Sequence, residues 1–110
     1  MATSSPTPNL NFYYDTFELA KWIDREKVCY DDGVTPCKPA PDMYLQAACK
    51  LGIKPEEMIV VEDSEVGVQA AHRANVGKII VITPNEHSIF ENDDRVHDVI
   101  HDYYHFERFL

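Results

Sequence analysis

The stretch that decides the fold class of this 110-residue chain is MIVVEDSEVGVQAA, residues 58–71. Its first four residues form a continuous apolar run of strand length, and three of them are β-branched, which is typical of a strand buried on both faces of a parallel sheet. Two acids end the run, and Ser64 can then cap a helix that reaches about Asn75 and carries its small apolar residues on one face. A buried strand that leads into an amphipathic helix indicates an α/β fold.

The segments on either side repeat this alternation. After Pro41, apolar residues at i, i+3, i+4 and i+7 predict an amphipathic helix that Gly52 ends. Residues 78–82 are a second buried-strand candidate, and 96–100 a weaker one. The apolar face predicted for the helix after Pro41 consists of Tyr44, Ala47, Ala48 and Leu51; that of the helix after Ser64 consists of Val66, Ala70, Ala71 and Ala74.

The ends of the chain are less regular. We interpret the Thr/Ser/Pro-rich residues 3–8 as a loop, 9–24 as a helix that breaks near Phe17, and 27–30 as a short strand. A short aromatic helix is predicted from Tyr103. Together these elements predict a single α/β domain over residues 1–110, with a mostly parallel sheet flanked by helices.

Composition excludes several kinds of partner. The chain has 10 basic and 19 acidic residues, a formal net charge of −9, and no basic cluster, so we expect no nucleic acid partner. No apolar run is long enough to span a membrane, and the first 15 residues lack the pattern of an export signal, so we expect a protein that is not exported. The three cysteines show no Cys-x-x-Cys spacing, which favours a reducing cytoplasm over a disulfide framework.

Polar residues with complementary chemistry follow the predicted strands. In open α/β sheets the ligand crevice lies outside the carboxyl ends of the strands, where Thr3-Ser4-Ser5, Lys38 and Glu62-Asp63 would meet. Adjacent carboxylates suit Mg²⁺, which prefers oxygen ligands and retained water. A lysine beside them would neutralise a phosphoryl group, and hydroxyl or backbone N–H groups could hold its oxygens. We therefore expect a site for magnesium and phosphate.

Two segments in this order resemble a known family. Lys38-Pro39-Ala40-Pro41-Asp42 and the residues 61–71 resemble the third and fourth motifs of the haloacid dehalogenase superfamily, with 24 positions from Lys38 to Glu62. The likeness is strongest to the branch of β-phosphoglucomutase and small sugar-phosphate phosphatases. It covers about residues 2–82 and implies a Rossmann-like parallel sheet.

The resemblance also implies roles for individual residues. Ala2-Thr3-Ser4-Ser5 is similar to the second motif, so Thr3, or Ser4 or Ser5 in its place, would bind the phosphate. Lys38 would be the catalytic residue that stabilises the charge of phosphate and nucleophile, and Asp63 with Glu62 would bind Mg²⁺. The implied substrate is a small phosphorylated metabolite, with sugar phosphates as the preferred class. Mutases and phosphatases share these motifs, so both reaction types stay open.

The first motif of the family is absent. It supplies an Asp-x-Asp, the aspartyl nucleophile and an acid/base, and this chain contains no Asp-x-Asp. Asp32-Gly33 is interpreted as a turn. The cap domain, which follows the first motif in the family, is absent too. The family's first strand lies in the middle of the sheet, between the strand near Thr3 and the strand that ends at Asp63, so its absence would leave two strand edges unpaired.

These observations leave two hypotheses open. The chain is the C-terminal portion of a magnesium-dependent phosphatase or phosphotransferase, inactive by itself, for which an N-terminal segment is missing. Alternatively, it is a non-catalytic fragment or interaction module that forms a homodimer through its open sheet edge. In either case the aromatic residues Tyr13, Tyr14, Phe17 and Trp22 are interpreted as core, or as surface bared by the missing strand and cap, rather than as a base-stacking platform.

Overall fold

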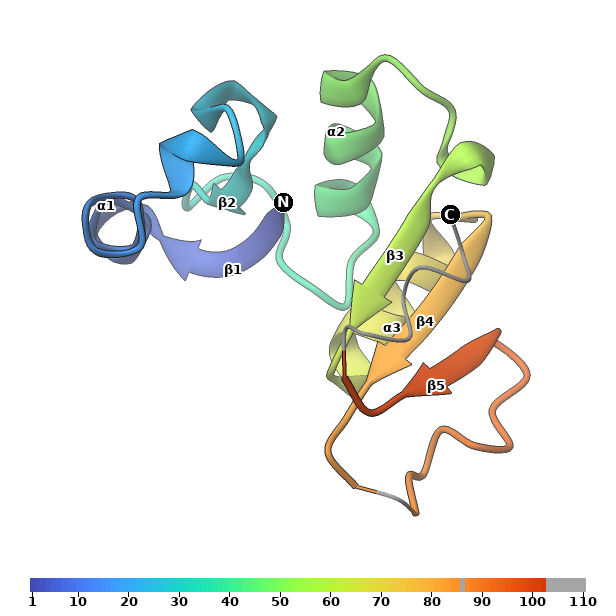
Figure 1. The fold of residues 1–110 in the computed structure, drawn as a ribbon. Coiled ribbons are helices and arrows are strands. Elements are labelled where there is room, and N and C mark those ends of the chain that lie inside the picture. The colour runs from blue at the N-terminus through green and yellow to red at the C-terminus, as the bar shows by residue number, and fades with distance from the viewer. Residues whose placement is uncertain (86, 103–110) are drawn as a thin grey trace.

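The strands of the described residues, 1–85 and 87–102 of the computed structural model, form two separate parallel sheets (Figure 1). The smaller sheet pairs β1 (Ala2–Pro6) with β2 (Cys29–Asp31). The larger sheet has the order β3 (Ile59–Glu62), β4 (Lys78–Ile82), β5 (Asp98–Ile100). Parallel strands flanked by helices confirm the predicted α/β class.

The larger sheet is the better formed of the two. β3 pairs with β4 without interruption from Ile59↔Lys78 to Glu62↔Val81, and β5 continues the sheet from Ile80↔Asp98. The middle of β4 is buried on both faces, as its unbroken apolar sequence predicts. Both predicted central strands are therefore confirmed, and their carboxyl ends lie at the same edge.

The two helices beside this sheet begin and end where the sequence predicts. α2 (Asp42–Leu51) stops at Gly52, which adopts a left-handed conformation with φ 69°. α3 (Glu65–Arg73) is capped by Ser64, whose hydroxyl accepts a hydrogen bond from the Gly67 N–H at 3.2 Å. Their apolar faces hold most of the core, together with Val60, Ile79 and Val81 from the strands.

Two residues of the predicted apolar faces are exposed instead. Leu51 is 50% exposed and Val66 is 47% exposed, so the prediction that both pack in the core is wrong. Helical spacing identifies the face of a helix that can be buried, but burial also needs a neighbouring element to cover it. Leu51 borders a hollow between the two sheets, and Val66 borders the hollow at the carboxyl ends of the strands.

The N-terminal region differs from the prediction in several respects: the predicted helix over 9–24 is α-helical only as far as Thr16, and the strand predicted at 27–30 is Cys29–Asp31. Of residues 3–8, interpreted as a loop, the first four belong to β1, which runs parallel to β2, and the last two begin α1 (Thr7–Thr16). Pairing with β2 stabilises a strand that Ser and Pro would not favour alone, which is a tertiary effect. The helical segment breaks at Phe17, as predicted. Within residues 1–85 and 87–102, single-turn 3₁₀ helices at Leu19–Lys21, Arg25–Lys27 and Pro55–Glu57 complete the order.

The aromatic residues of this region are not core. Trp22 is 82% and Phe17 is 60% exposed, and the only buried residue of α1 is Leu10. Phe17 instead packs against Phe12 and Tyr13, with ring centroids 6.4 and 6.1 Å apart. Of the two interpretations, core or bared surface, the exposed fractions of Phe17 and Trp22 support surface, because no described element covers that side of α1.

β1 and β3 each have one open edge within the described residues, since β1 pairs only with β2 and β3 only with β4. α2 lies beside both sheets (Figure 1) and contacts β1 and β2 on one side and α3 on the other. A hollow of about 290 Å³ separates the two edges and is floored by Tyr44, Ala47 and Leu51 of α2. The expected pair of unpaired edges is thus present.

An ion-pair cluster attaches the segment before β5 to α3. The Arg95 guanidinium lies 2.9 Å from Glu65 Oε1 and 2.6 Å from Asp93 Oδ2. Hydrogen bonding to Arg95 lowers the pKa of Asp93 to about 2, so this contact persists in mildly acidic solution.

The predicted helix from Tyr103 lies outside the described residues, and none of the described helices could span a bilayer.

Candidate active site

The predicted site residues meet in one hollow of about 540 Å³, which lies alongside β1 and at the carboxyl end of β3. β1 contributes Thr3 and Ser4, the loop before α2 contributes Lys38, and the end of β3 contributes Glu62 and Asp63. Segments that are far apart in the sequence thus converge as the parallel arrangement predicts. Their chemical roles depend on the contacts described next.

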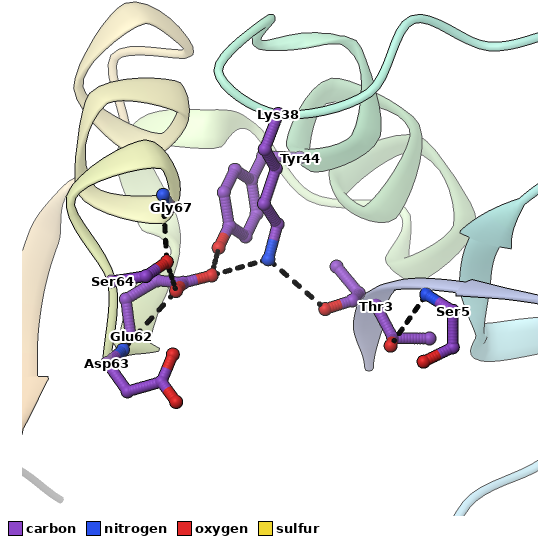
Figure 2. A network of polar contacts seen from close by, with 9 residues as sticks. Thr3, Ser5, Lys38, Tyr44, Glu62, Asp63, Ser64 and Gly67 are labelled. Atoms are coloured by element: carbon purple, nitrogen blue, oxygen red, sulfur yellow. Dashed lines mark hydrogen bonds and ion pairs between the residues drawn. The ribbon is translucent and has the colours of Figure 1, made fainter.

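Lys38 and Glu62 form a nearly buried ion pair. The Lys38 Nζ lies 2.5 Å from Glu62 Oε1, and the two side chains are 10% and 7% exposed. The same ammonium donates a longer hydrogen bond, 3.5 Å, to the backbone oxygen of Ala2 (Figure 2). Lys38 therefore connects β1 with β3 across the open edges of the two sheets and lines the 540 Å³ hollow of the site.

Glu62 is held on both of its oxygens. Oε1 accepts hydrogen bonds from Lys38 and from the Tyr44 hydroxyl. Oε2 accepts from the Asp63 N–H at 3.3 Å and from the Ser64 hydroxyl at 3.4 Å. These donors stabilise a charge that burial alone would disfavour. Glu62 is thus fully engaged within the protein.

Gly67 makes room for this carboxylate. A Cβ at Gly67, in the first turn of α3, would lie 1.9 Å from Glu62 Oε2, so any side chain there would displace the carboxylate. The first turn of a helix also favours negative charge, because its N–H groups point toward that end. The glycine of the 58–71 stretch thus serves the site rather than the helix.

Asp63 stands in a different environment from Glu62. Its side chain is exposed, lines the hollow, and takes no part in the network around Glu62 (Figure 2). Only the backbone N–H of Asp63 contacts that network. Of the two acids at the end of β3, Asp63 is therefore the one whose carboxylate is available to a ligand.

The hydroxyl groups of β1 face the acids across the hollow. Thr3 Oγ1 accepts a hydrogen bond from the Ser5 N–H at 3.2 Å, and Ser4 is exposed. Both residues line the same hollow as Lys38 and Asp63. A hydroxyl that accepts from the backbone can still donate its own proton to an anion. The arrangement can thus offer hydroxyl donors and an ammonium to one phosphate.

The donor set fits a magnesium ion that keeps most of its water. Among residues 1–85 and 87–102 no three His, Cys, Asp or Glu side chains gather closely enough to form a metal site by themselves. Proteins often bind Mg²⁺ through only one or two carboxylates, with substrate phosphate and water as the other ligands. Asp63 can supply one such carboxylate beside the proposed phosphate position.

Sequence reasoning did not identify Tyr44 as part of this site. Its position on the apolar face of α2 predicts a core residue, and its ring is indeed buried. Its hydroxyl nevertheless reaches Glu62. The available signal was the hydroxyl itself, because a buried tyrosine hydroxyl needs a hydrogen-bond partner.

Residues 1–75 match the family profile described as "haloacid dehalogenase-like hydrolase". The chain belongs to this family. A phosphorylated carbohydrates phosphatase of Thermotoga maritima is 34% identical to this haloacid dehalogenase-family chain over 79 residues, which are 72% of the chain and 36% of the phosphatase. The motif-based prediction of the family is therefore confirmed.

Solved structures of family members agree with the fold. A family IA, variant 3 hydrolase of Entamoeba histolytica superposes with a TM-score of 0.86 at 32% identity, over 94% of this haloacid dehalogenase-family chain and 47% of the other. A structure titled putative β-phosphoglucomutase, from Thermotoga maritima, superposes with a TM-score of 0.71 at 28% identity, over 90% and 45%. The chain thus spans about half the length of these structures. The predicted likeness to the β-phosphoglucomutase branch is also confirmed.

Proposed function

We propose that this chain supplies the phosphate- and magnesium-binding part of a phosphatase or phosphotransferase that acts on small phosphorylated metabolites. The observation that carries the proposal is the convergence of Lys38, Asp63 and the β1 hydroxyls on one hollow. The Thermotoga relative is named for phosphorylated carbohydrates, which favours sugar phosphates as the substrate class. We further propose a reducing cytoplasm as its compartment, since all three cysteines, which the structure describes, are free thiols.

Each residue has a distinct role in this proposal. Lys38 binds a phosphate oxygen and offsets negative charge that develops during transfer. Thr3 and Ser4 orient the phosphate through their hydroxyl groups. Asp63 binds Mg²⁺ directly, whereas Glu62 acts on the metal through its charge and orients Lys38. When bound, Mg²⁺ would neutralise the phosphate and fix its orientation.

The chain alone should bind phosphate without turning it over. Transfer in this family passes through an aspartyl nucleophile, and the sequence contains no Asp-x-Asp to supply it. Binding and chemistry are therefore separable here. Phosphate affinity reports on the part of the site that is present, and turnover reports on whether a nucleophile is available.

The decisive experiment compares the parent chain with Asp63→Asn. Calorimetric titration with inorganic phosphate should show that Mg²⁺ increases the affinity of the parent by about tenfold, a difference of ~1.4 kcal/mol. Asp63→Asn should lose this magnesium effect and retain the magnesium-independent binding through Lys38. Asp15→Asn, an exposed acid on α1, controls for the lost charge.

Two outcomes would contradict the proposal. If Mg²⁺ increased the phosphate affinity of the parent and of Asp63→Asn equally, the metal would not be bound by Asp63. In the second outcome, the purified parent hydrolyses p-nitrophenyl phosphate while Asp63→Asn does not. This result would show that the chain or a second copy of it supplies a nucleophile, and it would contradict the prediction that the chain alone is inactive.

Self-association is a second candidate function, favoured by the apolar residues that border the open sheet edges. Met1, Leu51 and Ile59 line the hollow between β1 and β3 and are 42%, 50% and 38% exposed. Open edges and exposed apolar side chains together favour pairing with another chain. A second copy of this chain is the occupant that the candidate specifies.

Sedimentation velocity tests this candidate. We expect the parent to form dimers at concentrations on the order of 10–100 μM, because two such edges bury little area and bind weakly. Ile59→Lys, which places a charge on the open edge of β3, should be monomeric, whereas Val34→Lys, at an exposed site in the turn after β2, should not change the dimer. A monomeric parent at all these concentrations would eliminate the candidate.

A further inference from the structure

Tyr44 contacts both residues of the Lys38–Glu62 ion pair. It lies in the first turn of α2, is 5% exposed, and donates its hydroxyl hydrogen to Glu62 Oε1. The Lys38 Nζ lies 5.1 Å from the centroid of the Tyr44 ring, within the range of a cation–π contact. Tyr44 therefore contacts both members of the ion pair (Figure 2).

The tyrosine hydroxyl and the lysine ammonium share a single acceptor. Lys38 and Tyr44 both donate to Oε1, while Oε2 takes its hydrogen bonds from Asp63 and Ser64. Tyr44 is thus a neutral donor to the oxygen that binds Lys38. Burial and the neighbouring Glu62 raise the pKa of Tyr44 above its ordinary value, so the hydroxyl keeps its proton and remains a donor.

This geometry bears on the availability of Lys38. An ammonium bound to a buried carboxylate has little charge left for a second anion, because the carboxylate neutralises it. A second donor on the same oxygen takes up part of that negative charge, so that less of it is left to neutralise the ammonium. The Tyr44 ring and the Ala2 carbonyl also contact the ammonium and so restrict its position.

We propose that Tyr44 is a positioning residue: its hydroxyl shares Glu62 Oε1 with Lys38 and so keeps the Lys38 ammonium directed at an anion in the hollow. The proposal rests on the phosphate site proposed above and adds a residue to it. Tyr44 itself does not line that hollow, so we expect it to act through Lys38 rather than on the phosphate.

Tyr44→Phe tests the hydroxyl alone, because it keeps the ring. Calorimetric titration with inorganic phosphate in the presence of Mg²⁺ should show binding about five- to tenfold weaker than that of the parent. Tyr14→Phe is the matched control, since it also removes one hydroxyl that donates a hydrogen bond, to the Ile23 carbonyl at 3.0 Å and away from the site. It should bind phosphate as the parent does.

A second readout reports on Lys38 directly. In protein labelled with ¹⁵N-lysine, the Lys38 ammonium should give a distinct ¹H–¹⁵N signal, assigned with Lys38→Met, because it is protected from solvent. This signal should shift in Tyr44→Phe and not in Tyr14→Phe. Replacing all tyrosines with 3-fluorotyrosine, which makes the phenol a stronger donor, should shift it in the opposite direction without removing any group.

The outcomes separate this inference from the proposed function. If the parent does not bind phosphate, the proposed function is wrong. The Lys38 ammonium signal of Tyr44→Phe, compared with that of the parent, still tests whether Tyr44 acts on Lys38. Unchanged phosphate affinity and an unchanged signal in Tyr44→Phe overturn the positioning role. If Tyr44→Phe does not fold, an unchanged signal in the fluorotyrosine protein overturns it, whereas a shift supports it.

Discussion

Lys38→Met should lower the free energy of unfolding by about 3 kcal/mol at neutral pH, because it leaves the buried Glu62 carboxylate without its cation. Methionine fills a similar volume, so the expected loss is electrostatic rather than a cavity. The Tyr44, Ser64 and Asp63 donors remain and keep the cost near the low end for a broken buried pair. Phosphate affinity should also fall more than tenfold.

Urea unfolding of three variants checks this expectation. Glu62→Gln combined with Lys38→Met should recover most of the loss, since a neutral amide needs no counterion. Lys21→Met is the matched control, because Lys21 pairs with Glu18 at 2.7 Å while both side chains are about two-thirds exposed. It should cost less than about 1 kcal/mol. Equal losses in Lys38→Met and Lys21→Met would show that the Lys38 pair is effectively solvated.

Gly77→Ala should destabilise the chain by a comparable amount, about 3 kcal/mol, for a steric reason. A Cβ at Gly77 would lie 2.2 Å from the backbone oxygen of Glu56 and 3.1 Å from that of Met58. Neither backbone can move easily, because the Gly77 N–H donates to Pro55 at 3.2 Å and the next residue begins β4. The substitution would therefore separate β4 from the segment that leads into β3.

Gly52→Ala provides the comparison for Gly77→Ala. Gly52 has a left-handed φ of 69° but no heavy atom within 4 Å of the added Cβ, so alanine there meets backbone strain alone. Such strain costs about 1 kcal/mol. Thermal and urea unfolding of both variants should rank Gly77→Ala as clearly the less stable. The reverse order would show that the β3–β4 junction relaxes around the new methyl group.

Local sequence patterns predicted the elements that carry their own signals. The apolar run before Glu62, the Ser64 cap and the Gly52 stop correctly place β3, α3 and the end of α2. The motif spacing also predicted which polar side chains would meet, because parallel strands bring their carboxyl ends to one edge. Their roles toward magnesium and phosphate stay predictions.

Other features depended on neighbours that no local pattern specifies. Residues 3–8 read as a loop, yet their first part is a strand because β2 lies beside it. Phe17, Trp22 and Leu51 read as core, yet they are exposed because no described element covers them. Burial is a property of the assembled chain, so a residue's hydrophobicity predicts only that it can be buried.

The sequence by itself determined the family, the α/β class, the convergence of Lys38 with Glu62 and Asp63, and the lack of an Asp-x-Asp nucleophile, since each depends on residue type and order along the chain. Only the tertiary structure decided which of the two acids is buried and which faces the hollow. Glu62 turns inward to Lys38 and Tyr44, whereas Asp63 stays exposed to the hollow. The physical reason is that successive residues of an extended chain point to opposite sides. Val60 and Glu62 lie on the buried side of β3, whereas Ile59 and Asp63, which directly follows the strand, are exposed.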